Sequence, residues 1–178
     1  MLALREVQSE QDEAQAWQLI REYLDWLDDC LQRDYHLHLD VDEMIAEDKL
    51  EAEKFVRPHG RFYLALSDDN VVGVGRLKKL DNEVAELKRM YVLPEYRGLG
   101  IGRLLLNQLI TDARTIGYQK LRLDSLRFLT PAYQMYQSVG FYEIDTYPGQ
   151  NTKLYAGDAD TSTNHPINFF MEMDLVSQ

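Results

Sequence analysis

Hydrophobic residues near the N-terminus recur at every third or fourth position, which is the period of one helix face. In residues 10–32 this stripe is formed by Trp17, Ile20, Leu24, Leu27 and Leu31. Ser9 is a suitable N-cap for that helix. Asp40 with Glu43 resembles a capping box that opens a second helix. The pattern therefore predicts helices over about 10–32 and 41–56.

Apolar and polar positions alternate in several other segments, which indicates strands. A short strand is expected over 3–7, a hairpin over 61–80 with its turn at Asp68, Asp69 and Asn70, and a further strand over 83–92. Aspartate and asparagine are typical turn residues, and connections this short join antiparallel neighbours. The strands between 61 and 92 are therefore expected to be antiparallel.

The second half of the chain alternates helices with strands. The expected elements are helices over 101–116 and 130–139 and strands over 119–126, 141–147 and 168–176. Gly117 is placed to cap the first helix, and Thr130 is the expected N-cap of the second. A helix between the strands 83–92 and 119–126 implies a crossover, so these two strands should be parallel. The polar connection 148–167 has a length that is usually functional or mobile.

Composition is typical of a single globular domain. Of 178 residues, 45% are hydrophobic and 28% are charged, which suits one sizeable core. We expect residues 1–178 to form one α/β domain with a mixed, mostly antiparallel central sheet flanked by helices. The chain lacks a run of 18 apolar residues and a signal-peptide layout, and its only cysteine, Cys30, excludes an intrachain disulfide. A cytoplasmic protein without a membrane partner is expected.

The net charge of −11 is unevenly distributed. Residues 1–60 contain 16 acidic and 6 basic side chains, giving −10, whereas residues 86–122 contain 3 acidic and 7 basic ones, giving +4. An acidic molecule repels a nucleic acid, so no nucleic-acid partner is expected. The basic segment suits a small polyanion.

Three glycines, Gly98, Gly100 and Gly102, precede or begin the helix expected at 101–116. Glycine allows a group to approach the backbone closely, and the first N–H groups of a helix have no internal partner, which suits an anion. A dinucleotide fingerprint would need glycine at Arg103 or Leu105, and a P-loop would end in Gly-Lys-Ser/Thr. Both are excluded, which disfavours a nucleotide-binding oxidoreductase. A turn that only permits tight packing remains an alternative.

Other candidate centres are weaker. His36 and His38 would share one side of an extended chain with Asp40, but the spacing supplies no third ligand, so no metal site is expected. Ser125 lacks the G-x-S-x-G context of a hydrolase.

Glu86 and Tyr136 carry the candidate chemistry. Alternation along 83–92 would place Glu86, Lys88 and Met90 on one face and Leu87, Arg89 and Tyr91 on the other. A partly desolvated carboxylate can act as a base near neutral pH; a structural ion pair is the alternative for Glu86. Tyr133 and Tyr136 lie in the helix 130–139, where a phenol suits protonation of a leaving thiolate. Core packing is the alternative for them.

Together these residues resemble the GCN5-related N-acetyltransferase (GNAT) superfamily. Arg97 to Gly102, "RGLGIG", resembles its R-x-x-G-x-G/A signature, and "PAYQMYQSVGF" resembles its second signature A-x-x-L-Y-x-x-x-G-F, with Met135 in place of leucine. The order of strands and helices is also similar over nearly the whole chain.

The resemblance implies a site residue by residue. The pyrophosphate of acetyl-CoA would be cradled by Arg97, Gly98, Leu99, Gly100, Ile101, Gly102 and Arg103. The pantetheine arm would contact the main chain of Met90, Tyr91 and Val92, where the strands 83–92 and 119–125 splay apart. Tyr136 would protonate the thiolate and Glu86 would be the base. Leu129 replaces an asparagine that contacts the cofactor in many members, so Ser125 or Thr130 is expected to substitute.

The resulting expectation is an acetyl-CoA-dependent N-acetyltransferase in which an amine attacks directly. The acceptor is a small-molecule or peptide amine, in a pocket formed by the first two helices and residues 146–165. A non-catalytic acyl-CoA-sensing or protein-binding module of the same fold is the alternative. A homodimer also stays open, because two-fold dimers are the commonest oligomers.

Overall fold

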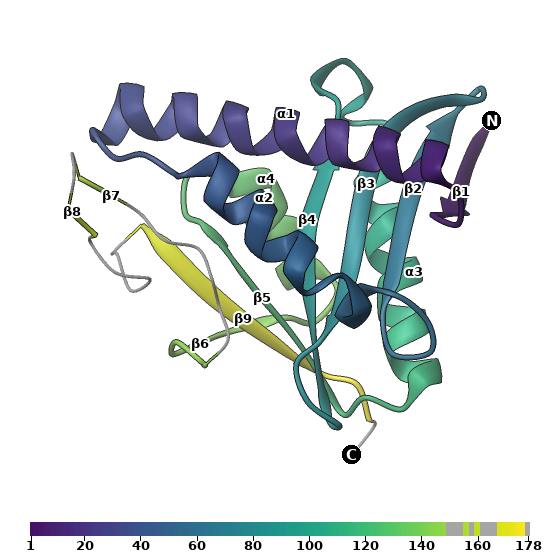
Figure 1. Cartoon of the computed structure of the whole chain (residues 1–178). Coiled ribbons are helices and arrows are strands. Elements are labelled where there is room, and N and C mark those ends of the chain that lie inside the picture. The colour runs from purple at the N-terminus through teal and green to yellow at the C-terminus, as the bar shows by residue number, and fades with distance from the viewer. Residues whose placement is uncertain (149–154, 157–158, 161–166, 177–178) are drawn as a thin grey trace.

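The structure, a computed structural model, describes residues 1–148, 155–156, 159–160 and 167–176. Within them one sheet has the strand order β1-β2-β3-β4-β5-β9-β6 (Figure 1). Its strands are β1 (Leu2–Glu6), β2 (Arg61–Ser67), β3 (Asn70–Lys79), β4 (Val84–Val92), β5 (Lys120–Leu126), β6 (Tyr142–Ile144) and β9 (Asn168–Asp174). β4 and β5 are parallel and every other pair is antiparallel. The expected mixed, mostly antiparallel sheet is confirmed.

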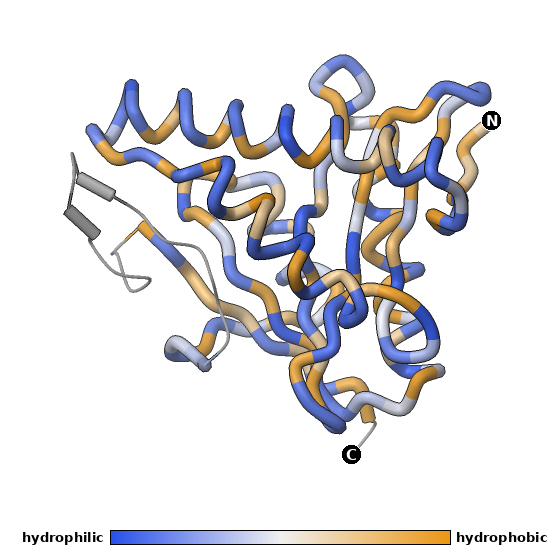
Figure 2. Tube along the Cα trace, in the orientation of Figure 1, coloured by the Kyte–Doolittle hydropathy of each residue, from blue (hydrophilic) through white to orange (hydrophobic). Residues whose placement is uncertain are grey.

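Helices cover both faces of this sheet. They are α1 (Glu10–Tyr35), α2 (Val41–Leu50), α3 (Ile101–Ile116) and α4 (Thr130–Ser138), with 3₁₀ turns at η1 (Ala52–Phe55) and η2 (Pro94–Tyr96). α1 and α2 lie on one face and α3 on the other (Figure 1). Two apolar cores result, one under α1 and α2 and one under α3 and α4. Figure 2 shows α1 with hydrophobic and hydrophilic bands that alternate along the helix, as its periodicity predicts.

Local capping explains most helix boundaries. Ser9 and Asp12 form a capping box at the start of α1, and the Asp40 side chain accepts from the Glu43 N–H at 2.8 Å. α2 ends earlier than expected because the chain tightens into η1, which buries Phe55 against the sheet. The expected N-cap Thr130 is wrong, since it is already the first residue of α4.

The expected alternation of faces along β4 is wrong beyond Lys88. The pairing of β4 with β3 contains a bulge, and Arg89 has a positive φ of 54°. Because a bulge adds one residue to a strand, Arg89 stays on the side of Lys88 and donates to Asp48 of α2. Met90 therefore packs in the α3 core, on the opposite face from Glu86.

The connection expected over 148–167 lies largely outside the described residues. Two short strands within it, β7 (Tyr155–Ala156) and β8 (Ala159–Asp160), pair with each other. The part of the expected acceptor pocket assigned to 146–165 is therefore described only at 146–148 and at these two strands.

Candidate acetyl-CoA site

The glycine motif forms a loop whose backbone donors have no partner among the described residues. Gly98 and Gly100 have φ values of 79° and 85°, and a Cβ on either would meet nothing within 4 Å. In the described part of the chain, the N–H groups of 98–103 donate to no acceptor, and Leu104 is the first to bond, to Gly100 O at 3.0 Å. An unpartnered helix N-terminus in open space is suited to bind an anion.

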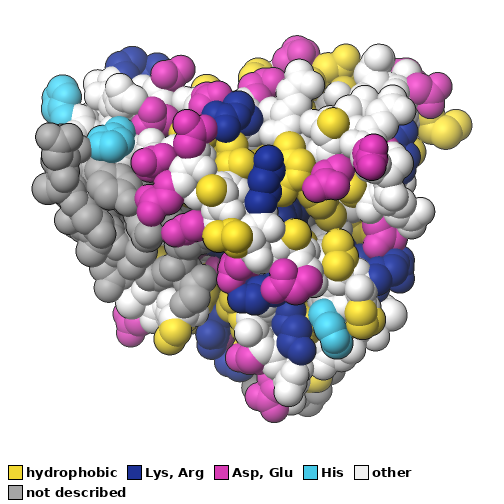
Figure 3. Space-filling view, viewed as in Figure 1, with side chains coloured by type: hydrophobic (Ala, Val, Ile, Leu, Met, Phe, Trp, Pro, Cys, Tyr) yellow, Lys and Arg dark blue, Asp and Glu magenta, His cyan; other side chains and the backbone are white. Residues whose placement is uncertain are grey.

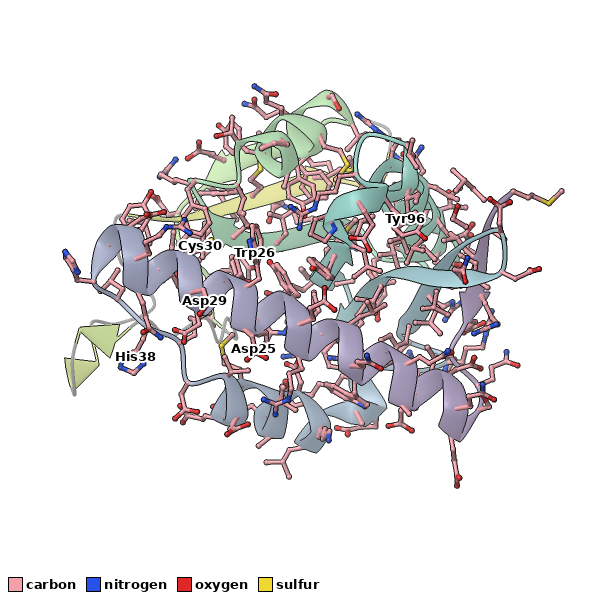
Figure 4. The ribbon with its side chains drawn as sticks, turned by 90° about the horizontal axis from the view of Figure 1, so that it is seen from above. Asp25, Trp26, Asp29, Cys30, His38 and Tyr96 are labelled. Atoms are coloured by element: carbon pink, nitrogen blue, oxygen red, sulfur yellow. The ribbon has the colours of Figure 1, made fainter. Side chains whose placement is uncertain are left out.

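Arg97 connects this loop to α1. Its guanidinium lies over the Trp26 ring at 4.8 Å and the Tyr91 ring at 5.6 Å, while its Nε donates to Val92 O at 3.1 Å. In Figure 4 Trp26 lies on the side of α1 that faces the segment of Tyr96. The stacking fixes Arg97 beside the loop.

Strands β4 and β5 separate near the middle of the sheet. They pair only at Val84, Ala85 and Glu86 on the β4 side, opposite Lys120 to Arg122. Farther along, β4 continues to Val92 and the signature loop, while β5 pairs with β9. This is the splay expected between 83–92 and 119–125. The predicted main-chain contacts of Met90, Tyr91 and Val92 to a cofactor remain predictions.

Glu86 lies at the point where this splay begins and is fully buried. Its Oε1 accepts a hydrogen bond from the Tyr147 hydroxyl at 2.7 Å, and its Oε2 lies 3.5 Å from Lys88 Nζ. Lys88 Nζ in turn donates to Asp124 Oδ1 of β5 at 3.0 Å. Glu86 therefore does form the ion pair that was the alternative to a catalytic role, but it shares Lys88 with Asp124.

These contacts set the protonation of the cluster. Burial raises the pKa of Glu86, and the Asp124 carboxylate raises it further, against the opposing effect of Lys88. Burial would lower the pKa of Lys88, but Asp124 and Glu86 outweigh it and raise that pKa. Lys88 therefore stays charged, while Glu86 can exchange a proton nearer to neutral pH than an exposed carboxylate.

Tyr136 is buried in the core under α3 and α4, in edge contact with Phe141 at 5.8 Å between ring centroids. Burial, followed by the nearby Tyr23 and Asp124, raises its pKa, so it keeps its proton. The Asp124 carboxylate raises the pKa of both Glu86 and Tyr136, and the roles of the two candidate residues remain predictions. Tyr133 instead is exposed to solvent in part and donates to Glu143 at 2.6 Å.

Sequence reasoning missed Tyr147 and the buried ion cluster on the α2 side of β3 and β4. In that cluster Asp48 pairs with Arg76 and Arg89, each at 2.9 Å. No local signal marks either feature, because the partners are far apart in the sequence.

Three further findings concern metal binding, surface hollows and membrane spans. Among the described residues, no group of three His, Cys, Asp or Glu side chains could hold a metal ion. A shallow hollow lined by Gln32, His36, Leu37 and His38 lies at the C-terminal end of α1, not at the splay. None of the helices in the described ranges is long and apolar enough to cross a membrane.

Known proteins share these features. The model of the acetyltransferase (GNAT) family matches residues 16–141. An IAA acetyltransferase of Azospirillum brasilense is 34% identical over 128 residues, which cover 71% of this chain and 75% of that protein. An uncharacterised N-acetyltransferase of Dictyostelium discoideum is 46% identical over 65 residues, or 36% of this chain. The chain spans 30% of that relative and 38% of a Schizosaccharomyces pombe relative.

Solved structures agree on the fold. A GNAT-family acetyltransferase of Staphylococcus aureus superposes with a TM-score of 0.70 at 23% identity, covering 99% of this chain and all of that one. An Elizabethkingia anophelis family member with acetyl-CoA bound has a TM-score of 0.64 at 19% identity, with 97% of both chains covered. The signature loop, the splay and these matches show that the chain belongs to the acetyltransferase (GNAT) family.

Proposed function

We propose that this protein transfers the acetyl group of acetyl-CoA directly to an amine, with Glu86 as general base and Tyr136 as general acid. The observation that carries the proposal is the position of Glu86. Its buried carboxylate lies where β4 and β5 separate, on the strand that leads to the start of α3, where the first N–H groups have no acceptor in the part of the chain that the structure describes. One strand thus joins an anion site to a base.

The loop residues fit the cofactor expected for the family. A pyrophosphate is suited by the N–H groups of 98–103, which have no acceptor within the described ranges, by two glycines with positive φ, and by the neighbouring Arg97 and Arg103. When bound, acetyl-CoA supplies the activated acetyl group. We assign its pyrophosphate to Arg97–Arg103 and its pantetheine arm to the main chain of Met90, Tyr91 and Val92.

The two side chains divide the proton transfers. An amine must be neutral to attack, so a base has to take its proton, and the raised pKa of Glu86 suits that task. The thiolate that leaves needs a proton, and Tyr136 still holds one because burial raises its pKa. Leu129 packs in the core under α1 and α2, so the expected substitution by Ser125 or Thr130 stays a prediction.

The acceptor is proposed to be a cationic small molecule or peptide amine. Acidic side chains gather over α1 and α2 (Figure 3), and Asp25 and Asp29 lie on the side of α1 away from Trp26 (Figure 4). Such a surface attracts cations.

We further infer a cytoplasmic enzyme, since a single cysteine suits a reducing compartment. A homodimer is the proposed oligomer.

A thiol-release assay tests the proposal. Acetyl-CoA is offered with polyamines, amino acids and lysine peptides, and we expect release with at least one amine, with polyamines ahead of acidic amino acids. Glu86→Gln should lower kcat by about 10²–10⁴-fold without changing the Kd for CoA. The surface control Glu143→Gln should change neither kcat nor the Kd for CoA. CoA binding with no thiol release across the panel would instead favour the non-catalytic module. Acidic amino acids as the best acceptors would contradict the cationic class.

A further inference from the structure

Tyr147 makes a long-range contact with the proposed base. It follows β6 in the chain, and its hydroxyl donates to Glu86 Oε1 at 2.7 Å across 61 residues of sequence. Both side chains are buried, at 6% and 0% exposure. The segment after β6 therefore reaches the carboxylate on which the proposed chemistry depends.

The Tyr147 ring is held by contacts that do not involve its hydroxyl. It meets Phe170 of β9 edge to face at 5.9 Å between centroids, and the Arg122 guanidinium lies 5.0 Å from its centroid. Arg122 is itself fixed by a 2.7 Å hydrogen bond from its Nε to Glu172 Oε2. The position of the hydroxyl is thus set by its surroundings, and the hydroxyl can impose an orientation on Glu86.

The two oxygens of Glu86 differ in their contacts. Oε1 is occupied by Tyr147, whereas Oε2 is buried and has no hydrogen-bond partner among the described residues. Lys88 Nζ lies 3.5 Å from Oε2 as an ion-pair contact, and its hydrogen bond goes to Asp124. A buried oxygen without a hydrogen bond costs free energy, and such an exception in a native fold calls for an explanation, of which a catalytic role is one.

We propose that Tyr147 is a positioning residue that holds Glu86 by Oε1 and leaves Oε2 as the atom that takes the proton of the acceptor amine. The inference rests on the proposed function of Glu86. The proton moves from the amine nitrogen to Oε2, directly or through one water, and the N–H electron pair stays on nitrogen for attack. Tyr147 keeps its own proton throughout.

The hydrogen bond also has a defined electrostatic effect. Glu86 faces Lys88 on its own strand, Lys78 on β3, Asp124 on β5 and Tyr147 after β6. Burial and Asp124 raise the pKa of Glu86, while Lys88, Tyr147 and Lys78 lower it. Removal of the Tyr147 hydroxyl takes away one of the groups that favour the ionised form, so the pKa of Glu86 should rise further.

Tyr147→Phe tests the proposal, because it removes the hydroxyl and keeps the ring. In protein labelled with ¹³Cδ-glutamate, the Glu86 resonance is identified by its loss in Glu86→Gln. We expect its titration midpoint to rise by about one pH unit in Tyr147→Phe, the effect of one lost hydrogen bond to a carboxylate. The acid limb of kcat/KM, measured with acetyl-CoA and the best amine of the panel, should move upward by the same amount.

Tyr133→Phe is the matched control, since it removes a tyrosine hydroxyl from another glutamate, Glu143, at 2.6 Å. It should leave the midpoint and the acid limb in place. A structural role alone would lower kcat or thermal stability without moving either quantity. An unchanged midpoint in Tyr147→Phe would overturn the proposal. Failure of the proposed function is distinct: Glu86→Gln would then be as active as wild type, while the midpoint would still report the contact.

Discussion

Replacement of Gly100 by alanine, compared with the same replacement at Gly117, should distinguish a loss of anion binding from a loss of stability caused by backbone strain. Gly100 caps the N-terminus of α3 with φ 85°, and Gly117 caps its C-terminus with φ 104°. A Cβ at either position would meet nothing within 4 Å. The two substitutions therefore have the same steric cost, that of an L-residue in the left-handed region, which is roughly 1–2 kcal/mol.

The two variants should be equally destabilised but should differ in binding. For a chain of this size, a loss of 1 kcal/mol lowers Tm by about 2–4 °C, so each variant should unfold about 2–8 °C earlier. Alanine at position 100 also turns the loop donors away from their ligand. Loss of one hydrogen bond to a charged phosphate, about 1.5–3 kcal/mol, raises the Kd for CoA by about 10- to 100-fold.

Calorimetric titration with CoA and a thermal melt of each variant measure the two effects. We expect the Kd of Gly117→Ala for CoA to stay within about twofold of the wild-type Kd, because Gly117 lies at the other end of α3 and is distant from the loop. Equal CoA affinity in the two variants, with equal losses of Tm, would refute the assignment of 98–103 as the pyrophosphate site.

The remaining predictions concern the general acid and the buried ion cluster. Tyr136→Phe should lower kcat by about 10²-fold or more with little change in the Kd for acetyl-CoA. Burial raises the pKa of Tyr136, so ionisation of this residue should cause no loss of wild-type kcat at any pH up to 10. An unchanged kcat in Tyr136→Phe would remove Tyr136 from the mechanism. Asp48→Asn should lower the free energy of unfolding at pH 7 by about 3–5 kcal/mol, measured in urea, because Arg76 and Arg89 lose their partner. Burial would raise the Asp48 pKa, but the two guanidiniums lower it overall. The loss of unfolding free energy in Asp48→Asn should therefore be complete above the pKa of an unfolded aspartate, about 3.9, and should disappear as pH falls through the lower pKa of Asp48 in the folded protein. A loss that does not depend on pH would contradict this.

Much of the site depends on local sequence and could be read from it. The loop at 98–102 needs glycines with positive φ next to a helix start, and both requirements are met within six residues. The crossover through α3 fixes the parallel pairing of β4 with β5. The glycine loop and this pairing were predicted correctly because they depend on neighbours in the chain, whereas the splay beside Glu86 was expected only from the resemblance to the family.

Other features required the folded chain. The bulge at Arg89 is set by the pairing of β4 with β3 and by Asp48, 41 residues away, which draws the guanidinium to the α2 side. Alternation alone assumes a regular strand, so it placed Met90 on the wrong face.

The amino-acid sequence by itself determined which segments are helices and strands, that Ser9 caps the start of α1, and that a glycine loop precedes α3. Caps, turns and hydrophobic periods depend on residues close together in the chain, so they can be recognised in the sequence alone. Only the tertiary structure decided that Tyr147 meets Glu86 and that Lys88 is shared with Asp124. Such contacts arise when distant segments pack and lose water together, so burial and partner choice become defined only in the fold.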